Sequence, residues 1–445
     1  MRIRLCVLVL VVAMVVAACD SSEPAPTSAA PSASTTTSLT IPERVEVPTT
    51  VDPGAADANT IERVTQAVRE SAAQVEVLRG LIFVIEPEVV VLEPEVFQDR
   101  LRAYYESVIA TSGPIGKTGL YRAAGLLRFD TAESIVARLE PPPTPAFYDM
   151  GRGQLIVTGD IDDTDPVQRA SLVHELVLAL TDQHHSTGAT RSDLVAAGAD
   201  DRLRAFDALV EGDATYFQLV FIQNLPGEAQ TAIAAAFEAT DAPVVGGIPD
   251  FIRSSLAFPY DAGTTFVADL VASAGIAAVD QAYRNPPVSS EHILHPERYR
   301  RGETAAAIAP LEIVVDGATT TRSATFGELQ IDQLLSLSLD AGLVTQTVDG
   351  WSGDQYQLVE TDDAFAFALS LAMQSDDDAI EVVTGLIAHA RQVLEAGDGV
   401  EAAGGLLWDN DEYYVFLDRV GDGLMYVLAT DRELGRAVRS QVQAP

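Results

Sequence analysis

The residues with the clearest chemical potential lie in the segment 171–185, which reads SLVHELVLALTDQHH. His174 and Glu175 are adjacent, and on a helix position 178 lies one turn after His174 on the same face. An H-E-x-x-H helix uses this spacing to offer two imidazoles to one zinc ion, with the glutamate as general base. Position 178 is occupied by Leu178, which has no lone pair for a metal. The segment therefore predicts a zinc-type site that lacks its second ligand.

Four other histidines could be considered as the missing second ligand. His184 and His185 follow His174 by about 15–16 Å along a helix axis, which is too far for one shared ion. His292 and His295 lie in the segment 286–299 and could approach from elsewhere in the fold. The alternative interpretation is that both only form hydrogen bonds that fix their own loop.

Helices and strands must position these residues. Asp165 and Pro166 form a helix start, with the aspartate as N-cap and the proline at the first helical position, and that helix carries His174. Hydrophobic periodicity predicts the remaining elements. We expect helices at 59–78, 95–110, 200–224, 264–283 and about 376–396, a strand or strand pair at 81–92, hairpins at 146–160 and 413–429, strands at 311–315 and 350–360, and a loop at 286–299.

The N-terminal residues predict export and a lipid anchor. Arg2 and Arg4 precede the apolar run 5–16, which is too short to span a bilayer and is typical of a secretory signal. The sequence Val-Ala-Ala-Cys at 16–19 resembles a bacterial lipobox, in which Cys19 is lipidated and becomes the N-terminus. An ordinary signal peptide is the alternative. Residues 20–58 are rich in Ser, Thr, Ala and Pro, and we expect them to form a disordered tether.

Composition limits the possible classes of function. The chain has 445 residues, of which 47% are hydrophobic, enough for a large core. Its formal net charge is -37, and Lys117 is its only lysine. Nucleic-acid binding is excluded by this balance, because neutralising phosphates takes clustered lysine and arginine.

A second segment completes the expected site. Residues 211–217 read EGDATYF, and 174–185 read HELVLALTDQHH. Together they resemble the EGxAxYF and HExxHALxDQH helices of a family of secreted bacterial zincin-like, gluzincin-type metallopeptidases. Further similarity lies in AFYDMGRGQLIV (146–157), FPYDAGTTFV (258–267), PPVSSEHILHPERY (286–299) and GWSGDQY (350–356), so the resemblance covers roughly residues 75 to 435.

The resemblance implies specific roles for several residues. His174 matches the first zinc ligand, Glu175 the general base and Glu211 the third ligand. Leu178 stands at the position of the second zinc ligand, which is a histidine in the family. His295 matches a family histidine that is one candidate for stabilising an oxyanion. We expect Gly212 to let its helix approach a neighbouring helix closely. Zinc binding is expected to be weak or absent, because a catalytic zinc normally has three protein ligands and an open fourth position.

The expected fold class is α+β. The resemblance implies a zincin-like fold with a mainly helical centre, a small sheet beside the helix that carries His174, and an α/β C-terminal region. The expected organisation is a lipoprotein signal peptide at 1–19, the tether at 20–58, a zincin-like domain at 59–304 and a C-terminal region at 305–445 packed on the same cleft.

Three functions follow from these expectations. The first is a membrane-anchored, extracytoplasmic pseudo-peptidase that binds a peptide or protein in the cleft. The second is an active zinc metallopeptidase with His295 or His292 as substitute ligand. The third is a structural protein of the cell envelope that uses no cleft. All three hypotheses have the membrane as a partner, which the protein would contact through the lipid on Cys19.

Replacing the lipobox cysteine tests the predicted anchor. The Cys19→Ser variant should no longer incorporate radiolabelled fatty acid and should be released into the medium, because it lacks the acyl chains that anchor the protein. Labelling and fractionation of intact cells measure both effects. Wild-type protein that is already soluble and cleaved at another residue would contradict the prediction.

Overall fold

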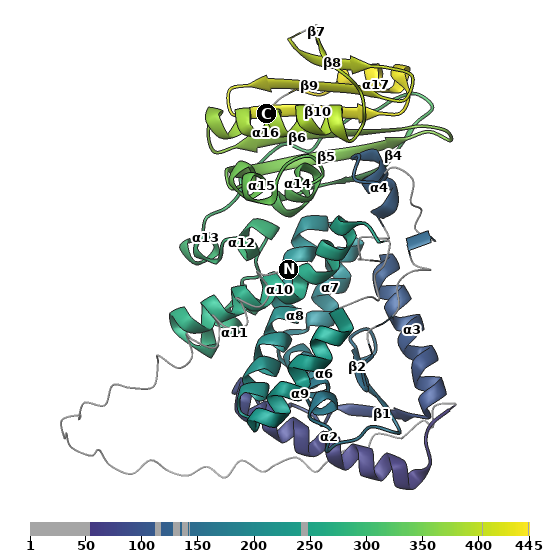
Figure 1. Ribbon diagram of the computed structural model, residues 1–445, viewed down its shortest axis with the longest axis vertical. Helices are drawn as coiled ribbons and strands as arrows, with labels where there is room; N and C mark the ends of the chain where they lie inside the picture. The colour runs from purple at the N-terminus through teal and green to yellow at the C-terminus, as the bar shows by residue number, and fades with distance from the viewer. Residues whose placement is uncertain are drawn as a thin grey trace, which may run out of the picture. The chain divides into compact units, whose positions relative to one another are not determined.

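The computed structural model describes residues 54–111, 117–127, 134–135, 141, 143–241, 248–402, 404–443 and 445. These residues form helices, one small sheet and one larger sheet, so the fold class is α+β, as predicted (Figure 1). Residues from Ala56 to Pro445 belong to one compact unit. The predicted signal peptide, Cys19 and the tether up to residue 53 lie outside the described residues.

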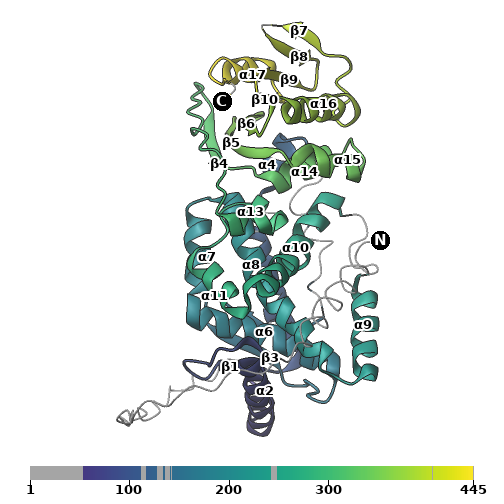
Figure 2. The ribbon, with the colours of Figure 1, turned by 90° about the vertical axis from the view of Figure 1, so that its left-hand side faces the viewer.

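Helix α8 (Asp200–Gln223) lies among the other long helices (Figure 2). It packs against α6 (Pro166–His185), α7 (Thr187–Ala196) and α10 (Asp250–Ala274). Most of α8 is buried, and its apolar side chains join those of α6 and α10 in the largest hydrophobic cluster. Other helices that precede β4 in the described chain are α2 (Ala58–Arg79), α3 (Pro94–Thr111), α4 (Thr118–Ala123), α9 (Gly227–Asp241), α11 (Ile276–Arg284), α12 (Ser290–Leu294) and α13 (Pro296–Arg301).

The small sheet lies beside α6. Its order is β1 (Glu88–Leu92), β3 (Gln154–Thr158), β2 (Ala146–Asp149), with β1 parallel and β2 antiparallel to β3. Strand β2 is therefore an edge strand, and its position next to α6 decides what surrounds Glu175.

The large sheet is antiparallel, and helices cover both its faces. Alternate residues of β10 face different clusters: Leu424 and Tyr426 pack in one, Met425 and Val427 in the other. Helix α16 (Asp376–Gln392) contributes to the first cluster and α17 (Arg432–Arg439) to the second. The strand order is β4 (Thr319–Ala324), β5 (Trp351–Glu360), β6 (Phe365–Met373), β10 (Gly423–Ala429), β9 (Tyr414–Val420), β8 (Gly405–Asp409), β7 (Val400–Ala402); α14 (Glu328–Leu335) and α15 (Ala341–Val348) precede β5.

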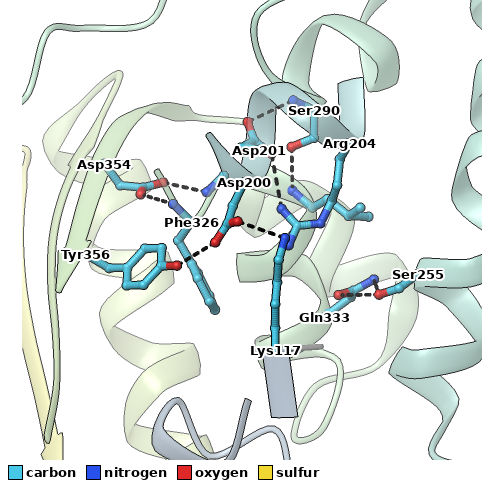
Figure 3. A network of polar contacts seen from close by, with 12 residues as sticks. Lys117, Asp200, Asp201, Arg204, Ser255, Ser290, Phe326, Gln333, Asp354 and Tyr356 are labelled. Carbon is cyan, nitrogen blue, oxygen red and sulfur yellow. Dashed lines mark hydrogen bonds and ion pairs between the residues drawn. The ribbon is translucent and has the colours of Figure 1, made fainter. Parts of the chain in front are cut away.

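A buried polar network joins α8 to the large sheet (Figure 3). The Asp200 carboxylate pairs with Lys117 at 2.9 Å and accepts hydrogen bonds from Arg322 of β4 and Tyr356 of β5. Burial lowers the pKa of Lys117 to about 8, with Arg204 acting in the same direction and Asp200 opposing both. Replacing one member of such a buried set leaves the others unpaired. The network therefore fixes the start of α8 to β4 and β5.

The GWSGDQY segment also has a structural role. Asp354 accepts hydrogen bonds from the backbone N–H groups of Phe326 and Gly327 (Figure 3). It also accepts a hydrogen bond from the indole N–H of Trp351. These contacts hold the chain that leads from β4 into α14. Residues 350–356 thus position the sheet on the helices.

Several predicted elements differ in the structure. Only Glu88–Leu92 of the predicted 81–92 strand region is a strand, and the predicted strand at 311–315 is absent. Residues 264–283, predicted as one helix, are helical except at Gly275, whose φ is 76°. They form the end of α10, which starts at Asp250 and contains Pro259, and most of α11. Residues 286–299, predicted as a loop, contain the short helix α12 and the start of α13. The other predicted helices and both hairpins are present.

In the described part of the chain, no single helix has the length and hydropathy to cross a membrane. Helices α10 and α11 pass that test only as a pair, and they are bent by 117° at their junction.

Helices α8 and α10 cross at glycines. A Cβ on Gly212 would overlap the backbone of Gly263, and a Cβ on Gly263 would overlap the backbone of Ala208. The prediction that Gly212 permits a close helix approach is therefore confirmed. This approach also sets the position of Glu211, the residue before Gly212.

Adding one methyl group at this crossing should separate the two helices. We expect Gly212→Ala to lower the free energy of unfolding by at least about 2 kcal/mol, because the backbone of Gly263 cannot yield as a side chain can. Urea denaturation measures the change. Gly342→Ala is the matched control: this glycine is in α15 with nothing near its Cβ position, so the change should be neutral or slightly stabilising.

Candidate functional site

His174 and Glu211 meet between α6 and α8. Asp165 starts α6 by accepting a hydrogen bond from the Val167 N–H at 2.9 Å, as the sequence predicts. The His174 Nε2 lies 3.2 Å from the Glu211 Oε2, and both side chains are largely but not fully buried. Residues 37 apart in sequence are thus brought into contact as expected, while their role as metal ligands stays a prediction.

The charge state of His174 follows from this contact. Burial alone would lower its pKa, but the hydrogen bond with Glu211 and the charges of Glu175 and Glu211 together raise it. Gln218, seven residues after Glu211 on α8, donates to the Ala170 carbonyl at 3.0 Å and contributes to the raised pKa of His174. Its position two helical turns after Glu211 was a signal available in the sequence.

Glu175 points to the edge of the small sheet. Its Oε2 accepts a hydrogen bond from the Tyr148 N–H at 2.8 Å. Burial raises the pKa of Glu175 to about 7; the positive charge of His174 acts against this shift, and the negative charge of Glu211 acts with it. Glu175 therefore holds its proton far more readily than an exposed glutamate does.

Side chains occupy the free edge of β2. The Thr158 N–H donates to the Pro145 carbonyl. In this antiparallel register, the backbone N–H and C=O groups of residue 147 point to β3, whereas those of residues 146 and 148 point to the free edge. The Tyr148 N–H is bound by Glu175, and its carbonyl accepts a hydrogen bond from the Tyr104 hydroxyl at 3.0 Å. The Ala146 carbonyl accepts a hydrogen bond from the Thr144 hydroxyl at 2.7 Å. An added peptide strand would have to displace these side chains, because it needs the same backbone groups.

Tyrosines surround the two carboxylates. The Tyr104 ring stacks on Phe147 of β2 with ring centroids 4.9 Å apart, and the Tyr260 centroid lies 6.3 Å from that of His174. Burial first, and then the charges of Glu175 and Glu211, raise the pKa of Tyr104. The charge of Glu211 is the largest cause of the raised pKa of Tyr260. Both phenols therefore stay protonated as hydrogen-bond donors. The sequence analysis missed them, because nothing in the spacing of 104 and 260 connects them to 174.

A guanidinium lies nearby. The Arg191 Nε donates to the Asp207 Oδ1 at 2.9 Å, and Asp207 is one turn before Glu211 on α8. Burial lowers the pKa of Arg191, but the charges of Asp207, Tyr104 and Glu211 raise it overall. The site thus contains acids, an imidazole, phenols and one paired cation.

The donor set does not fit a catalytic zinc ion. Zinc ligands at about 2.1 Å in a tetrahedral site lie about 3.4 Å apart, so the 3.2 Å between His174 and Glu211 suits either a hydrogen bond or a shared ion. Leu178 is buried in the hydrophobic core and supplies no donor. Within the residues that the structure describes, no three His, Cys, Asp or Glu side chains are grouped to hold a metal ion. A catalytic zinc needs a third protein ligand.

His292 and His295 have other partners. The His292 Nδ1 faces the Val288 N–H and its Nε2 faces the Glu303 carbonyl at 2.8 Å, so both ring nitrogens are occupied. The His295 Nε2 lies 2.8 Å from the Glu328 Oε1. Among the described contacts, neither histidine reaches His174, Glu175 or Glu211.

His184 and His185 lie at the far end of α6. They line a surface pocket of about 380 Å³ together with residues of α11 and the loop after α2. The His185 ring stacks on Tyr283 at 4.4 Å, and His184 faces the Ile82 carbonyl at 2.8 Å. The pocket therefore does not include the site around His174.

Comparisons with known proteins gave no match: no protein-family model, no curated protein and no solved structure is detectably similar to the chain. The resemblance to zincin-like peptidases thus stays an expectation from the motifs.

The pKa of Glu175 gives a testable dependence of stability on pH. The folded protein keeps the Glu175 proton up to about pH 7, whereas the unfolded chain loses it near 4.5, so this residue makes stability fall between these pH values. Glu175→Gln is uncharged and keeps an acceptor for the Tyr148 N–H. As the pH rises from 4.5 to 7.5, we expect the unfolding free energy of this variant to increase relative to that of wild type by up to about 3 kcal/mol. Urea denaturation at each pH measures it, and a difference independent of pH would contradict the assignment.

Proposed function

We propose that the protein is a membrane-anchored extracytoplasmic lipoprotein with a zincin-like fold that binds a peptide or protein at the His174–Glu211 site without hydrolysing it. The observation that carries the proposal is the donor set. His174 and Glu211 are 3.2 Å apart, whereas the position that a second imidazole needs holds the buried Leu178. Without a bound metal, the pKa of water stays high and Glu175 has no activated nucleophile to serve.

The charges at the site indicate what kind of group it would bind. Once Glu175 is ionised, it and Glu211 carry two negative charges beside one imidazole. A cationic group of a ligand, such as a lysine or arginine side chain, would relieve this repulsion. Tyr104 and Tyr260 would supply phenol donors and aromatic surface around it. A basic side chain of a peptide is therefore the group best matched to the site.

The alternative of an active zinc metallopeptidase has less support. It requires His295 or His292 as a substitute ligand, and the ring nitrogens of His292 are occupied by Val288 and Glu303. His295 would first have to leave the buried carboxylate of Glu328. A structural envelope protein is the other alternative, and it differs in predicting no ligand at this site.

Restoring the missing imidazole tests the proposal. Wild-type protein should purify with far less than one zinc per chain and show no peptidase activity. Leu178→His should raise zinc occupancy, because two imidazoles and a carboxylate make a three-ligand site. Elemental analysis after dialysis measures the zinc content of each variant. Activity need not return, since positioning of a substrate requires further contacts.

The control is the double variant Leu178→His with Glu211→Gln, which keeps the new imidazole but removes the carboxylate. Its zinc content should return to the wild-type level. The contrary result would be stoichiometric zinc in wild-type protein that is lost on His295→Ala or His292→Ala, and it would favour the active enzyme.

A further inference from the structure

The loop between α2 and β1 exposes aliphatic side chains. Ile82, Val84 and Ile85 are 74%, 67% and 68% exposed, and Val77 in the last turns of α2 is 83% exposed. We name these four residues the apolar rim. Leu81 and Phe83, which alternate with them, pack against the hydrophobic core. The loop is therefore anchored by one set of apolar side chains and presents a second set to its surroundings.

The backbone of this loop is bound by side chains of the protein. Gln183 of α6 accepts from the N–H groups of Val84 and Ile85, at 2.9 and 3.2 Å, and donates to the Ile85 carbonyl at 3.1 Å. His184 hydrogen-bonds to the Ile82 carbonyl at 2.8 Å, and the Phe83 N–H donates to Glu76. Loops usually leave such groups to water. Here these five groups are satisfied internally, and such pairing favours contact of a segment with an apolar medium.

We propose that the apolar rim inserts into the interfacial region of a lipid bilayer and orients the protein on the membrane. Because the N–H groups of residues 83–85 are occupied, the loop cannot pair with a strand of a protein partner, and its exposed aliphatic side chains remain for contact. The formal net charge of -37 opposes association of two copies through this surface.

The position of the rim is compatible with the predicted anchor, and in this respect the inference rests on the proposed lipoprotein. The 22 residues of α2 span about 33 Å from the end of the predicted tether to the rim. A flexible chain of the tether's length has an end-to-end distance of about 34 Å. A lipid on Cys19 would thus leave the rim within reach of the same membrane.

Charges around the rim predict the type of binding. Arg69 is paired with Glu86 at 3.6 Å, and Glu88 faces Gln154, so these side chains do not form a basic surface. Binding should therefore depend on apolar insertion, show little dependence on salt and need no anionic lipid.

The experiment uses residues 20–445, which contain the whole compact unit from Ala56 onward but neither the signal peptide nor Cys19. Both cysteines of the chain are thereby removed, so Ile85→Cys creates a single site for an environment-sensitive fluorophore. With phosphatidylcholine vesicles, the label at 85 should shift to the blue. The same label at Val420→Cys, on an exposed strand end elsewhere, should not shift.

Variants of the rim test the apolar contribution. Ile82→Ser with Val84→Ser should lower the vesicle partition coefficient about tenfold or more, because two aliphatic side chains no longer leave water. Val314→Ser with Val420→Ser removes comparable exposed side chains elsewhere and should leave it unchanged. Urea denaturation verifies that both double variants stay folded.

Three results would overturn the inference: no partition into vesicles, partition that needs phosphatidylglycerol and disappears at high salt, or a rim-dependent dimer in analytical ultracentrifugation. Since the chain tested has no lipid, none of these results depends on whether Cys19 is acylated or whether the His174 site binds a ligand.

Discussion

Carboxylates buried along α8 are the constraint on which the described fold depends. Burying a charge is costly unless it is paired, so each acid requires a partner from another element. Asp200 is paired by Lys117 and by Arg322 of β4, and Asp207 by Arg191 of α7. The remaining pairs are Asp201 with the Ser290 N–H, Glu211 with His174, and Asp213 with Arg79 and Tyr283. One helix thereby fixes the positions of α2, α6, α7, α12 and the large sheet.

Glu211 differs from its neighbours on α8 in the kind of partner it has. Asp213 faces the guanidinium of Arg79, which stays charged, whereas Glu211 faces an imidazole whose charge can change. Glu175 adds a second carboxylate, and its pKa rises to about 7 as a result of burial. Asp207 and Asp213 each face a guanidinium, whereas the site combines two carboxylates with one imidazole. Perturbed pKa values beside a specific charge partner are common at functional sites, which supports the proposed binding role.

The sequence predicted those parts that follow from local patterns. Asp165 and Pro166 locate the start of α6, and alternation locates the hairpins, because both signals act within a few residues. The missing strand at 311–315 has a physical cause. Gln357 hydrogen-bonds to both backbone groups of Ile313, and Gln441 to both of Val314. Glutamine side chains thus take the place of a neighbouring strand, which no local pattern indicates.

Site residues divide in the same way. The contact between His174 and Glu211 could be expected from motif resemblance, whereas Tyr104 and Tyr260 could not, since they reach the site only through the packing of α3 and α10. Pro259 would normally end a helix, and its presence inside α10 concealed that one continuous helix carries Tyr260 to the site. The placement of these two tyrosines at the site therefore depends on long-range packing, which the spacing of residues in the sequence does not indicate.

Several polar residues of the motif helix also have a structural partner that does not involve metal. Glu175 binds the Tyr148 N–H, and Asp182 accepts hydrogen bonds from the Tyr148 hydroxyl, the Thr187 hydroxyl and the Gly188 N–H. Gln183 and His184 hold the loop that carries the apolar rim. These residue types are required for α6 to hold β2, α7 and the loop in place, whether or not zinc is bound. The motif by itself is therefore evidence for this arrangement of elements. At position 178 the requirements of the fold and of catalysis differ: leucine packs well in the core, and an imidazole would be needed only for a metal.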